Sequence, residues 1–248
     1  MRVSSTPLLG RFAAIALSCL PAALPFLSCS SSSANQAGPP SSTDQDAAAP
    51  AAVNPDGVPY PSKGFGNTAR TGNTPGNVMQ NFTFQGYPDA DESKGLQTIS
   101  LANYYDPCRK RSKLLHVTVA GVWCVPCNQE TDALVAAKAE LASDGVVVIQ
   151  ALGDGPVEGV GATVTDLNNW VAKHMSNFTE MLDPGFANFG SFFDTAAVPW
   201  NCDIDPRTME ILRESTGWPG DLDMELQPAL AALPAEPGYP VPAVCGDQ

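Results

Sequence analysis

The chain has 248 residues, of which 13 are Lys or Arg and 26 are Asp or Glu, so its formal net charge at pH 7 is −13. This length allows one or two domains. The acidic balance argues against a nucleic-acid-binding protein, because there is no basic surface to neutralise phosphates. The charge favours solubility and carries no information about the fold.

The first 28 residues have the composition of a secretory signal peptide. Arg2 and Arg11 precede an apolar run, FAAIALSCLPAALPFLSC, that is too short and too interrupted by proline for a stable membrane span. The run ends at Cys29 and four serines follow, a pattern that resembles the lipobox of bacterial lipoproteins. Cys29 is therefore the expected lipidation site, in preference to Cys19, and a plain secretory signal is the alternative. Removal of residues 1–28 leaves a net charge of −15, because it removes two arginines and no acidic residue.

Residues 29–77 are predicted to form a disordered tether between the lipidated cysteine and a folded domain. Ser, Ala, Pro and Gly dominate this segment, and its large apolar residues are too few to offset the entropy cost of ordering the chain. We expect a folded domain over residues 78–233 and an irregular, Pro-rich tail over residues 234–248.

The folded domain is predicted to begin with two short strands, over residues 81–86 (NFTFQG) and 96–100 (LQTIS). Ser100 is expected to cap a short helix that runs through Tyr104. Residues 114–121 (LLHVTVAG) form a nearly continuous apolar run, which is typical of a buried central strand.

A helix is predicted over residues 128–142, where apolar residues recur at helical spacing, and Asp144-Gly145 is expected to end it. Residues 145–152 (GVVVIQAL) form a second buried strand. Strand, helix and strand thus follow one another within about forty residues, and this order indicates an α/β fold.

The glycine-rich loop GDGPVEGVGAT follows, without the G-x-G-x-x-G spacing or the G-K-[ST] ending of phosphate-binding loops. Thr165 is expected to cap the next helix. The remaining predictions are a helix over residues 165–174, a strand over 180–182, a hairpin of 198–204 with 209–213, and a helix over 221–233 that contains Pro228.

Cys124 and Cys127 lie where the central apolar strand gives way to a helix. They form a redox pair, half of a metal site or a structural disulfide. The unpaired N–H groups and partial positive charge of a helix N-terminus favour a thiolate at Cys124, and Pro126 suits a helix start because it lacks an N–H. In a redox pair, Cys124 attacks a partner's disulfide and Cys127 then attacks the mixed disulfide and releases the reduced partner.

The other two interpretations are weaker. A zinc site needs two more ligands at suitable spacing, and the remaining cysteines and histidines include no second close pair. A disulfide that closes a two-residue loop constrains little of the unfolded chain. We therefore expect no metal, and no cofactor beyond a redox-active disulfide between Cys124 and Cys127.

The segment Trp123-Cys124-Val125-Pro126-Cys127 resembles the active site of the thioredoxin superfamily. It resembles most closely the TlpA/ResA-like branch, which comprises membrane-tethered thiol–disulfide oxidoreductases of bacterial envelopes. The resemblance spans roughly residues 78–233, and it includes Glu130, Leu182-Asp183-Pro184 and Val198-Pro199. It implies a three-layer α/β fold with a central mixed sheet flanked by helices, extra N-terminal strands and an inserted helix.

The resemblance also implies the roles of individual residues. Cys124 is the attacking cysteine and Cys127 the resolving one. A cis proline, here Pro199, faces the cysteine pair, and the backbone of Val198 pairs with a bound peptide as an added strand would. The implied substrate-binding residues are Trp123, Val125, Pro126, Val198 and Pro199.

Two positions depart from the pattern of the superfamily. Thr118 stands where thioredoxins have a buried acid that assists proton transfer, and a hydroxyl is a poor base at neutral pH. Glu130 is expected to take over this role if its carboxyl group reaches Cys127. The alternative is a solvated acid that stabilises the first turn of its helix. Trp200 stands where the branch usually has a smaller residue.

Five cysteines remain beyond Cys29, so at least one is free unless it pairs between chains. We expect a disulfide between Cys108 and Cys245, with the tail folded back, and a buried thiol at Cys202 within the sheet. His116 is expected to be structural. The residues expected to lie in a turn are Asp203, Asp205 and Arg207.

Together, the residues and the resemblance imply an exported protein of the bacterial cell envelope, lipid-anchored and facing the periplasm. Its expected partners are protein thiols and disulfides of the envelope, an upstream redox donor protein and, through the anchor, the membrane. The resemblance implies that the protein reduces its partners rather than oxidising them. The alternatives are a non-catalytic peptide-binding lipoprotein and a peroxiredoxin-like peroxidase, although the Thr-x-x-Cys motif of the latter is absent.

Overall fold

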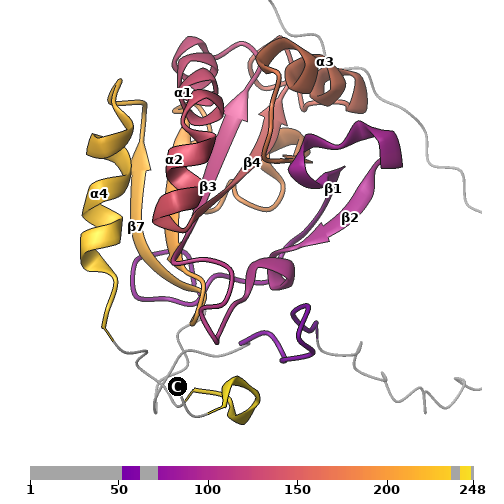
Figure 1. Cartoon of the computed structure of the whole chain (residues 1–248). Coiled ribbons are helices and arrows are strands. Elements are labelled where there is room, and N and C mark those ends of the chain that lie inside the picture. The colour runs from indigo at the N-terminus through magenta and orange to yellow at the C-terminus, as the bar shows by residue number, and fades with distance from the viewer. Residues whose placement is uncertain (1–51, 62–71, 236–240, 247–248) are drawn as a thin grey trace, which may run out of the picture. The chain divides into compact units, whose positions relative to one another are not determined.

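The structure is a computed structural model that describes residues 52–61, 72–235 and 241–246. A seven-stranded sheet has the order β2-β1-β5-β4-β3-β6-β7 (Figure 1). Its strands are β1 (Thr83–Tyr87), β2 (Gln97–Ser100), β3 (Leu114–Gly121), β4 (Val146–Asp154), β5 (Thr179–Leu182), β6 (Trp200–Asp205) and β7 (Glu210–Thr216). The α-helices are α1 (Val125–Ala136), α2 (Lys138–Asp144), α3 (Val164–His174) and α4 (Leu222–Ala232). Within the described ranges, no helix is long and apolar enough to cross a membrane.

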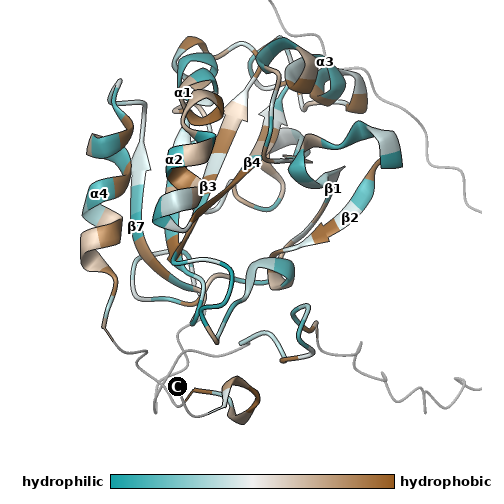
Figure 2. Ribbon diagram, viewed as in Figure 1, coloured by the Kyte–Doolittle hydropathy of each residue, from teal (hydrophilic) through white to brown (hydrophobic). Residues whose placement is uncertain are grey.

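The sheet is mixed. β3, β4 and β5 are parallel, whereas β1–β2 at one edge and β6–β7 at the other pair antiparallel with their neighbours. Every residue of β3 is buried, as the nearly continuous apolar sequence of this strand predicts. In Figure 2, β3 and β4 are largely coloured as apolar, in contrast to the mixed colours of the surrounding helices.

Alternation along β3 sends successive side chains to opposite faces of the sheet. Leu114 packs in a cluster with Leu134 and Leu141 of α1 and α2 and with Leu226 of α4. Leu115 packs in a second cluster, which holds aromatic residues of the segments around β1 and β6. Helices α1, α2 and α4 thus pack in the first cluster, whereas the second cluster combines residues of α3 with the segments around β1 and β6.

This arrangement is the thioredoxin-like fold that the resemblance implied, with β1 and β2 as the extra N-terminal strands and α3 as the inserted helix. Two local predictions need correction. The helix predicted over residues 128–142 is two helices, α1 and α2, that meet at Ala137. The cap of α3 is Thr163 rather than Thr165, because Thr163 and Asp166 form a reciprocal capping box.

The prediction of a disordered tether through residue 77 is wrong for residues 52–61 and 72–77. The Tyr60 side chain is buried and its hydroxyl donates to the carbonyl oxygen of Met79 at 2.8 Å, while the Asn54 amide donates to Tyr105. A few aromatic and polar residues are enough for a segment to dock on an existing core, although they could not form one of their own. The predicted signal peptide, residues 1–28, and the lipidation site at Cys29 lie outside the described residues.

The tail is tied to the domain by a disulfide between Cys108 and Cys245, the pairing expected from the sequence. Cys108 lies in the segment before β3, and Cys245 ends a short 3₁₀ turn. Cys202, on β6, is buried and free. Burial raises the pKa of the Cys202 thiol well above its usual value, so this cysteine is held as an unreactive thiol.

Loss of the Cys108–Cys245 bond is expected to lower the free energy of unfolding by about 2–4 kcal/mol, because the bond constrains an unfolded chain over a long loop. The two cysteines are 137 positions apart. Urea denaturation of Cys245→Ser without reductant measures the effect. Cys108→Ser is the matched control, since it removes the same bond and should lose the same stability. Wild-type stability in both variants would contradict the expectation.

Candidate active site

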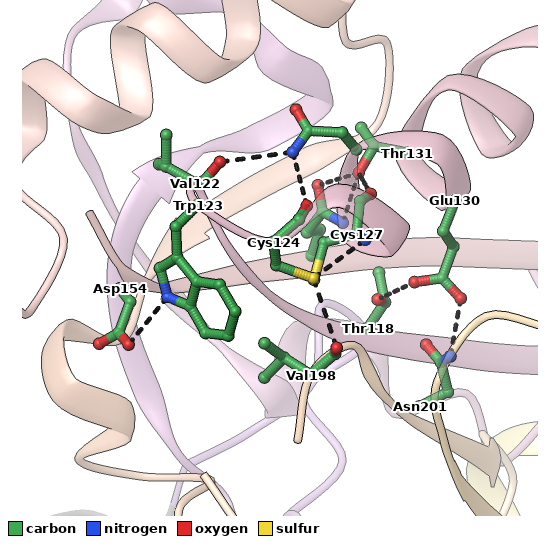
Figure 3. Close-up of a disulfide and its surroundings, with 12 residues drawn as sticks. Thr118, Val122, Trp123, Cys124, Cys127, Glu130, Thr131, Asp154, Val198 and Asn201 are labelled. Atoms are coloured by element: carbon green, nitrogen blue, oxygen red, sulfur yellow. Dashed lines mark hydrogen bonds between the residues drawn. A yellow bond between two sulfur atoms is a disulfide. The ribbon is translucent and has the colours of Figure 1, made fainter. Parts of the chain in front are cut away.

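Cys124 and Cys127 are joined by a disulfide at the start of α1 (Figure 3). Cys124 is the N-cap residue, and the backbone amide of Cys127 donates to the Cys124 sulfur at 3.1 Å. Pro126 occupies the first turn, where a missing N–H costs nothing. The open N–H groups of the helix end therefore point toward the sulfur that would carry negative charge in the reduced state.

Asn128 holds the turn before the helix. Its side-chain amide donates to the carbonyl oxygens of Val122 and Cys124, at 3.3 and 2.6 Å. Its carbonyl oxygen accepts from Lys173 and lies 3.1 Å from Nε2 of His174. The inserted helix α3 is therefore linked to the cysteine turn through Asn128. This role of Asn128 was not predicted, because its only signal in the sequence is a polar residue directly after the second cysteine.

The segment before β6 faces the cysteine pair. The Val198–Pro199 peptide bond is cis, and the carbonyl oxygen of Val198 lies 3.3 Å from Sγ of Cys124. Val125 is 66% exposed, whereas Cys124 is 1% exposed in this disulfide form. Trp123 and Pro126 are partly exposed. The structure thus brings together around Cys124 all five residues implied to bind substrate.

The Trp123 indole is fixed by Asp154, a contact that was not predicted from the sequence. Its Nε1 donates to Oδ2 of Asp154 at 3.2 Å (Figure 3). Asp154 ends β4 and is 1% exposed. The sequence signal for this contact is weak, because Asp154 lies among glycines beyond the end predicted for the strand, at residue 152.

Glu130 is fully buried, which rules out the alternative of a solvated acid. Its carboxylate accepts from the Thr118 hydroxyl at 3.0 Å and from the Asn201 amide at 2.7 Å (Figure 3). Thr118 and Asn201 face each other across β3 and β6. Among the described residues, no hydrogen bond joins Glu130 to Cys127, which lies one helical turn before it. Thr118 stands where thioredoxins have a buried acid. It donates a hydrogen bond to Glu130, the acid expected to take over that role.

Burial raises the pKa of Glu130 from 4.5 to about 7, although the charge of His116 and the two hydrogen bonds oppose the rise. The carboxyl group consequently exchanges its proton near neutral pH. A buried acid with this pKa, one helical turn from the second cysteine, is a candidate for the proton carrier expected from the sequence.

Asp203 was predicted as a turn residue, and this is wrong: it lies within β6, buried, and Oδ1 is 2.8 Å from Nδ1 of His116. Burial alone would lower the pKa of His116, but the hydrogen bond and charge of Asp203 raise it. The strand register places this pair next to Thr118 and Asn201 on the same sheet face. His116 is thus a structural histidine with a buried counter-ion, and its charge acts on Glu130.

No family model and no curated protein matches the chain. Among solved structures, the chain is similar to a protein from Chlorobium tepidum described provisionally as the thiol:disulfide interchange protein DsbE, with 21% identity and a TM-score of 0.49 over 63% of this chain and 96% of that one. It is also similar to the exposed lipoprotein thioredoxin Etrx1 of Streptococcus pneumoniae, with 19% identity and a TM-score of 0.44 over 60% and 98%. AhpC of Enterococcus faecalis has 13% identity and a TM-score of 0.47 over 62% and 89%.

Proposed function

We propose that this protein is a thiol–disulfide oxidoreductase of the TlpA/ResA-like type, which exchanges disulfides with other proteins through Cys124 and Cys127. The observation that carries the proposal is the position of the cysteine pair. It caps α1, and its first sulfur lies 3.3 Å from the carbonyl oxygen of Val198. A backbone segment at that distance is placed to pair with a polypeptide while its cysteine reacts.

Disulfide exchange needs only the two cysteines and the two sulfur atoms of the partner's disulfide. In the reduced protein, the Cys124 thiolate attacks one sulfur of a partner's disulfide, which forms a mixed disulfide and expels the partner's other sulfur as a thiolate. Cys127 loses its proton and attacks the Cys124 sulfur, which restores the disulfide and releases the partner's second thiolate. Two electrons pass to the partner, and its two sulfurs end as thiols. An upstream donor protein must then reduce the Cys124–Cys127 bond.

The two rival functions make different use of the same site. A non-catalytic binding module has no need for two cysteines with a backbone amide directed at the first. A peroxidase needs a cysteine that peroxide reaches, and the sequence lacks the Thr-x-x-Cys motif of peroxiredoxins. We place the protein in the bacterial envelope as a lipoprotein anchored at Cys29, with reduction of partners as its direction. This assignment follows from the signal sequence and the resemblance.

Turnover assays test the function directly. The purified protein, without residues 1–28, is expected to catalyse reduction of insulin disulfides by dithiothreitol, and a Cys124→Ala variant to show only the uncatalysed rate. Hydrogen peroxide offered as the oxidant is expected to be consumed no faster by the wild type than by Cys124→Ala. Rapid peroxide consumption that depends on Cys124 would favour the peroxidase, and inactivity toward both substrates would favour the binding module.

A further inference from the structure

A concave surface adjoins Trp123, the residue before Cys124. It is a cleft of about 280 Å³ between the loop that follows β4 and the segment that leads to Pro199, and we call it the Asp154 cleft. Its lining includes Asp154, Glu158, Phe186, Thr195 and Ala196. The cleft shares Asp154 with the active site, since this carboxylate accepts the hydrogen bond from Trp123.

One oxygen of the Asp154 carboxylate lacks a hydrogen-bond partner among the described residues. Its Oδ2 accepts from the Trp123 indole and from the backbone amide of Gly159, at 3.2 and 2.8 Å. Its Oδ1 is buried and has no hydrogen-bond partner among the described residues. A buried carboxylate oxygen without a donor carries a desolvation cost that a bound cation would remove.

The rest of the lining suits an extended side chain with a positive end. Glu158 is exposed and adds a second negative charge at the cleft. Phe186 supplies an aromatic ring, which packs against β4 because Gly153 has no side chain: a Cβ there would lie 2.1 Å from the ring. A metal ion fits less well, because the described residues contain no group of three His, Cys, Asp or Glu able to hold one.

The separation between the Asp154 cleft and the cysteine pair determines which residue of a substrate could place its side chain in the cleft. Thr195 and Ala196 precede Val198 by three and two residues. Three residues of chain span at most about 11 Å, so the cleft lies within that reach of the point where Val198 would pair with a substrate strand. A side chain two or three residues from the reacting cysteine is therefore in range.

We propose that the Asp154 cleft binds a Lys or Arg side chain that lies two or three residues from the substrate cysteine, so that the preferred substrates are polypeptides with a basic residue near the reactive disulfide. The proposal rests on the proposed disulfide exchange. The cation would pair with the carboxylate of Asp154 with Glu158 nearby, and its aliphatic stem would lie along the cleft. The net charge, which is −15 without residues 1–28, would add a long-range attraction for basic partners that is separate from this local site.

Single-cysteine peptides that carry a 2-nitro-5-thiobenzoate group in disulfide linkage test the proposal. The reduced Cys127→Ser variant isolates the first step, in which the Cys124 thiolate attacks the peptide sulfur, forms a Cys124–peptide disulfide and expels the coloured thiolate. Peptides with Lys two or three residues from the cysteine are compared with norleucine at the same position. An isomeric peptide with Lys at its far end keeps the net charge and controls for long-range attraction.

The peptide with the nearby Lys is expected to react about tenfold faster than both controls, the gain from one charge-assisted hydrogen bond. In the Cys127→Ser background, Asp154→Asn is expected to bring the ratio of the rate constants for Lys and norleucine close to one. Glu158→Gln, at an exposed position, is expected to lower the same ratio by a smaller factor. Glu140→Gln, which removes an equal charge on α2, is the matched control and should leave the ratio unchanged.

The ratio of the rate constants for the Lys and norleucine peptides distinguishes a binding role of Asp154 from a structural one, because a structural defect in Asp154→Asn would slow both peptides equally. A preference for nearby Lys that survives Asp154→Asn and Glu158→Gln would overturn the proposal, as would equal rates for the Lys and norleucine peptides in the unmodified site. In both cases disulfide exchange itself would stand. Failure of every peptide to release the coloured thiolate would overturn both the cleft proposal and the proposed function.

Discussion

Replacing Cys127 with serine is expected to stop turnover and to leave partner proteins covalently attached to Cys124. In the wild type, the resolving sulfur is held one helical turn from the mixed disulfide, and well-oriented intramolecular reactions have effective molarities of about 10⁵ M or more. An external thiol at millimolar concentration cannot replace such a group. We therefore expect turnover to fall by at least about 1,000-fold, because only external thiol then releases the partner.

Non-reducing gels of cells that produce Cys127→Ser are expected to show adducts that disappear on reduction, and mass spectrometry of the adducts identifies the partners. Cys124→Ser is the matched control: it keeps Cys127, which is fully buried in the disulfide form, and should give no adducts. Equal adducts in both variants would show that Cys124 is not the attacking residue. Absence of adducts together with wild-type turnover in Cys127→Ser would refute the two-cysteine mechanism.

The parts of the fold that the sequence predicted well are those in which local pattern and burial agree. The bounds predicted for the central strand, residues 114–121, are those of β3, because the whole stretch is buried, most of its residues are apolar and Gly121 ends it. The break between α1 and α2 at Ala137 could not be predicted, since the apolar spacing continues across it and no Gly or Pro marks the position. Docking of residues 52–61 depends on the distant residues Met79 and Tyr105, which no local pattern contains.

The residues of the candidate site show the same distinction between those marked by a local motif and those brought together only by the fold. The cysteine pair with Pro126 forms one short motif, and Val198-Pro199 forms another. The first was predicted from the residues themselves, and the role of the second was implied by the resemblance. Asn201 and Asp203 act only because the register of β6 against β3 sets them beside Thr118 and His116. A one-residue shift of that register would turn both side chains to the other face of the sheet. Sequence reasoning identified Glu130 and Thr118 separately, but their hydrogen bond became visible only in the structure.

Glu130→Gln is expected to slow the resolving step about 100-fold at pH 7 while leaving the attack by Cys124 less affected, because general-base catalysis by a positioned group contributes about 10²–10⁴-fold. Cys127 must lose a proton before it attacks. Glu130, buried one turn away, has a pKa raised to about 7 by burial. Above that pH the carboxylate is ionised and can accept the proton, and below it the carboxyl group is already protonated. The wild-type resolving rate should therefore rise with pH through about 7 and follow the ionisation of Glu130.

Acid quenching, alkylation of thiols and mass spectrometry over time follow the lifetime of the mixed disulfide across pH 5–9. In Glu130→Gln the inflection near pH 7 should vanish, leaving only the ionisation of the thiol itself near its ordinary pKa of about 8.5. Thr118→Val is the matched variant: it removes a hydrogen bond that lowers the pKa of Glu130, so the inflection should move to higher pH. A pH profile of Glu130→Gln identical to that of the wild type would assign the proton transfer to another group.

Stability supplies an independent check on the same ionisation. The folded pKa of Glu130 is about 7, against 4.5 in the unfolded chain, so between these values the folded state binds more protons than the unfolded state. The contribution of Glu130 to stability is therefore largest below about pH 4.5 and falls as the pH rises to about 7. Glu130→Gln removes this fall, so denaturation midpoints of the variant relative to the wild type should increase from pH 5 to pH 7. A relative midpoint independent of pH would show that the buried carboxyl group keeps an ordinary pKa, and the role of Glu130 as proton carrier would fail with it.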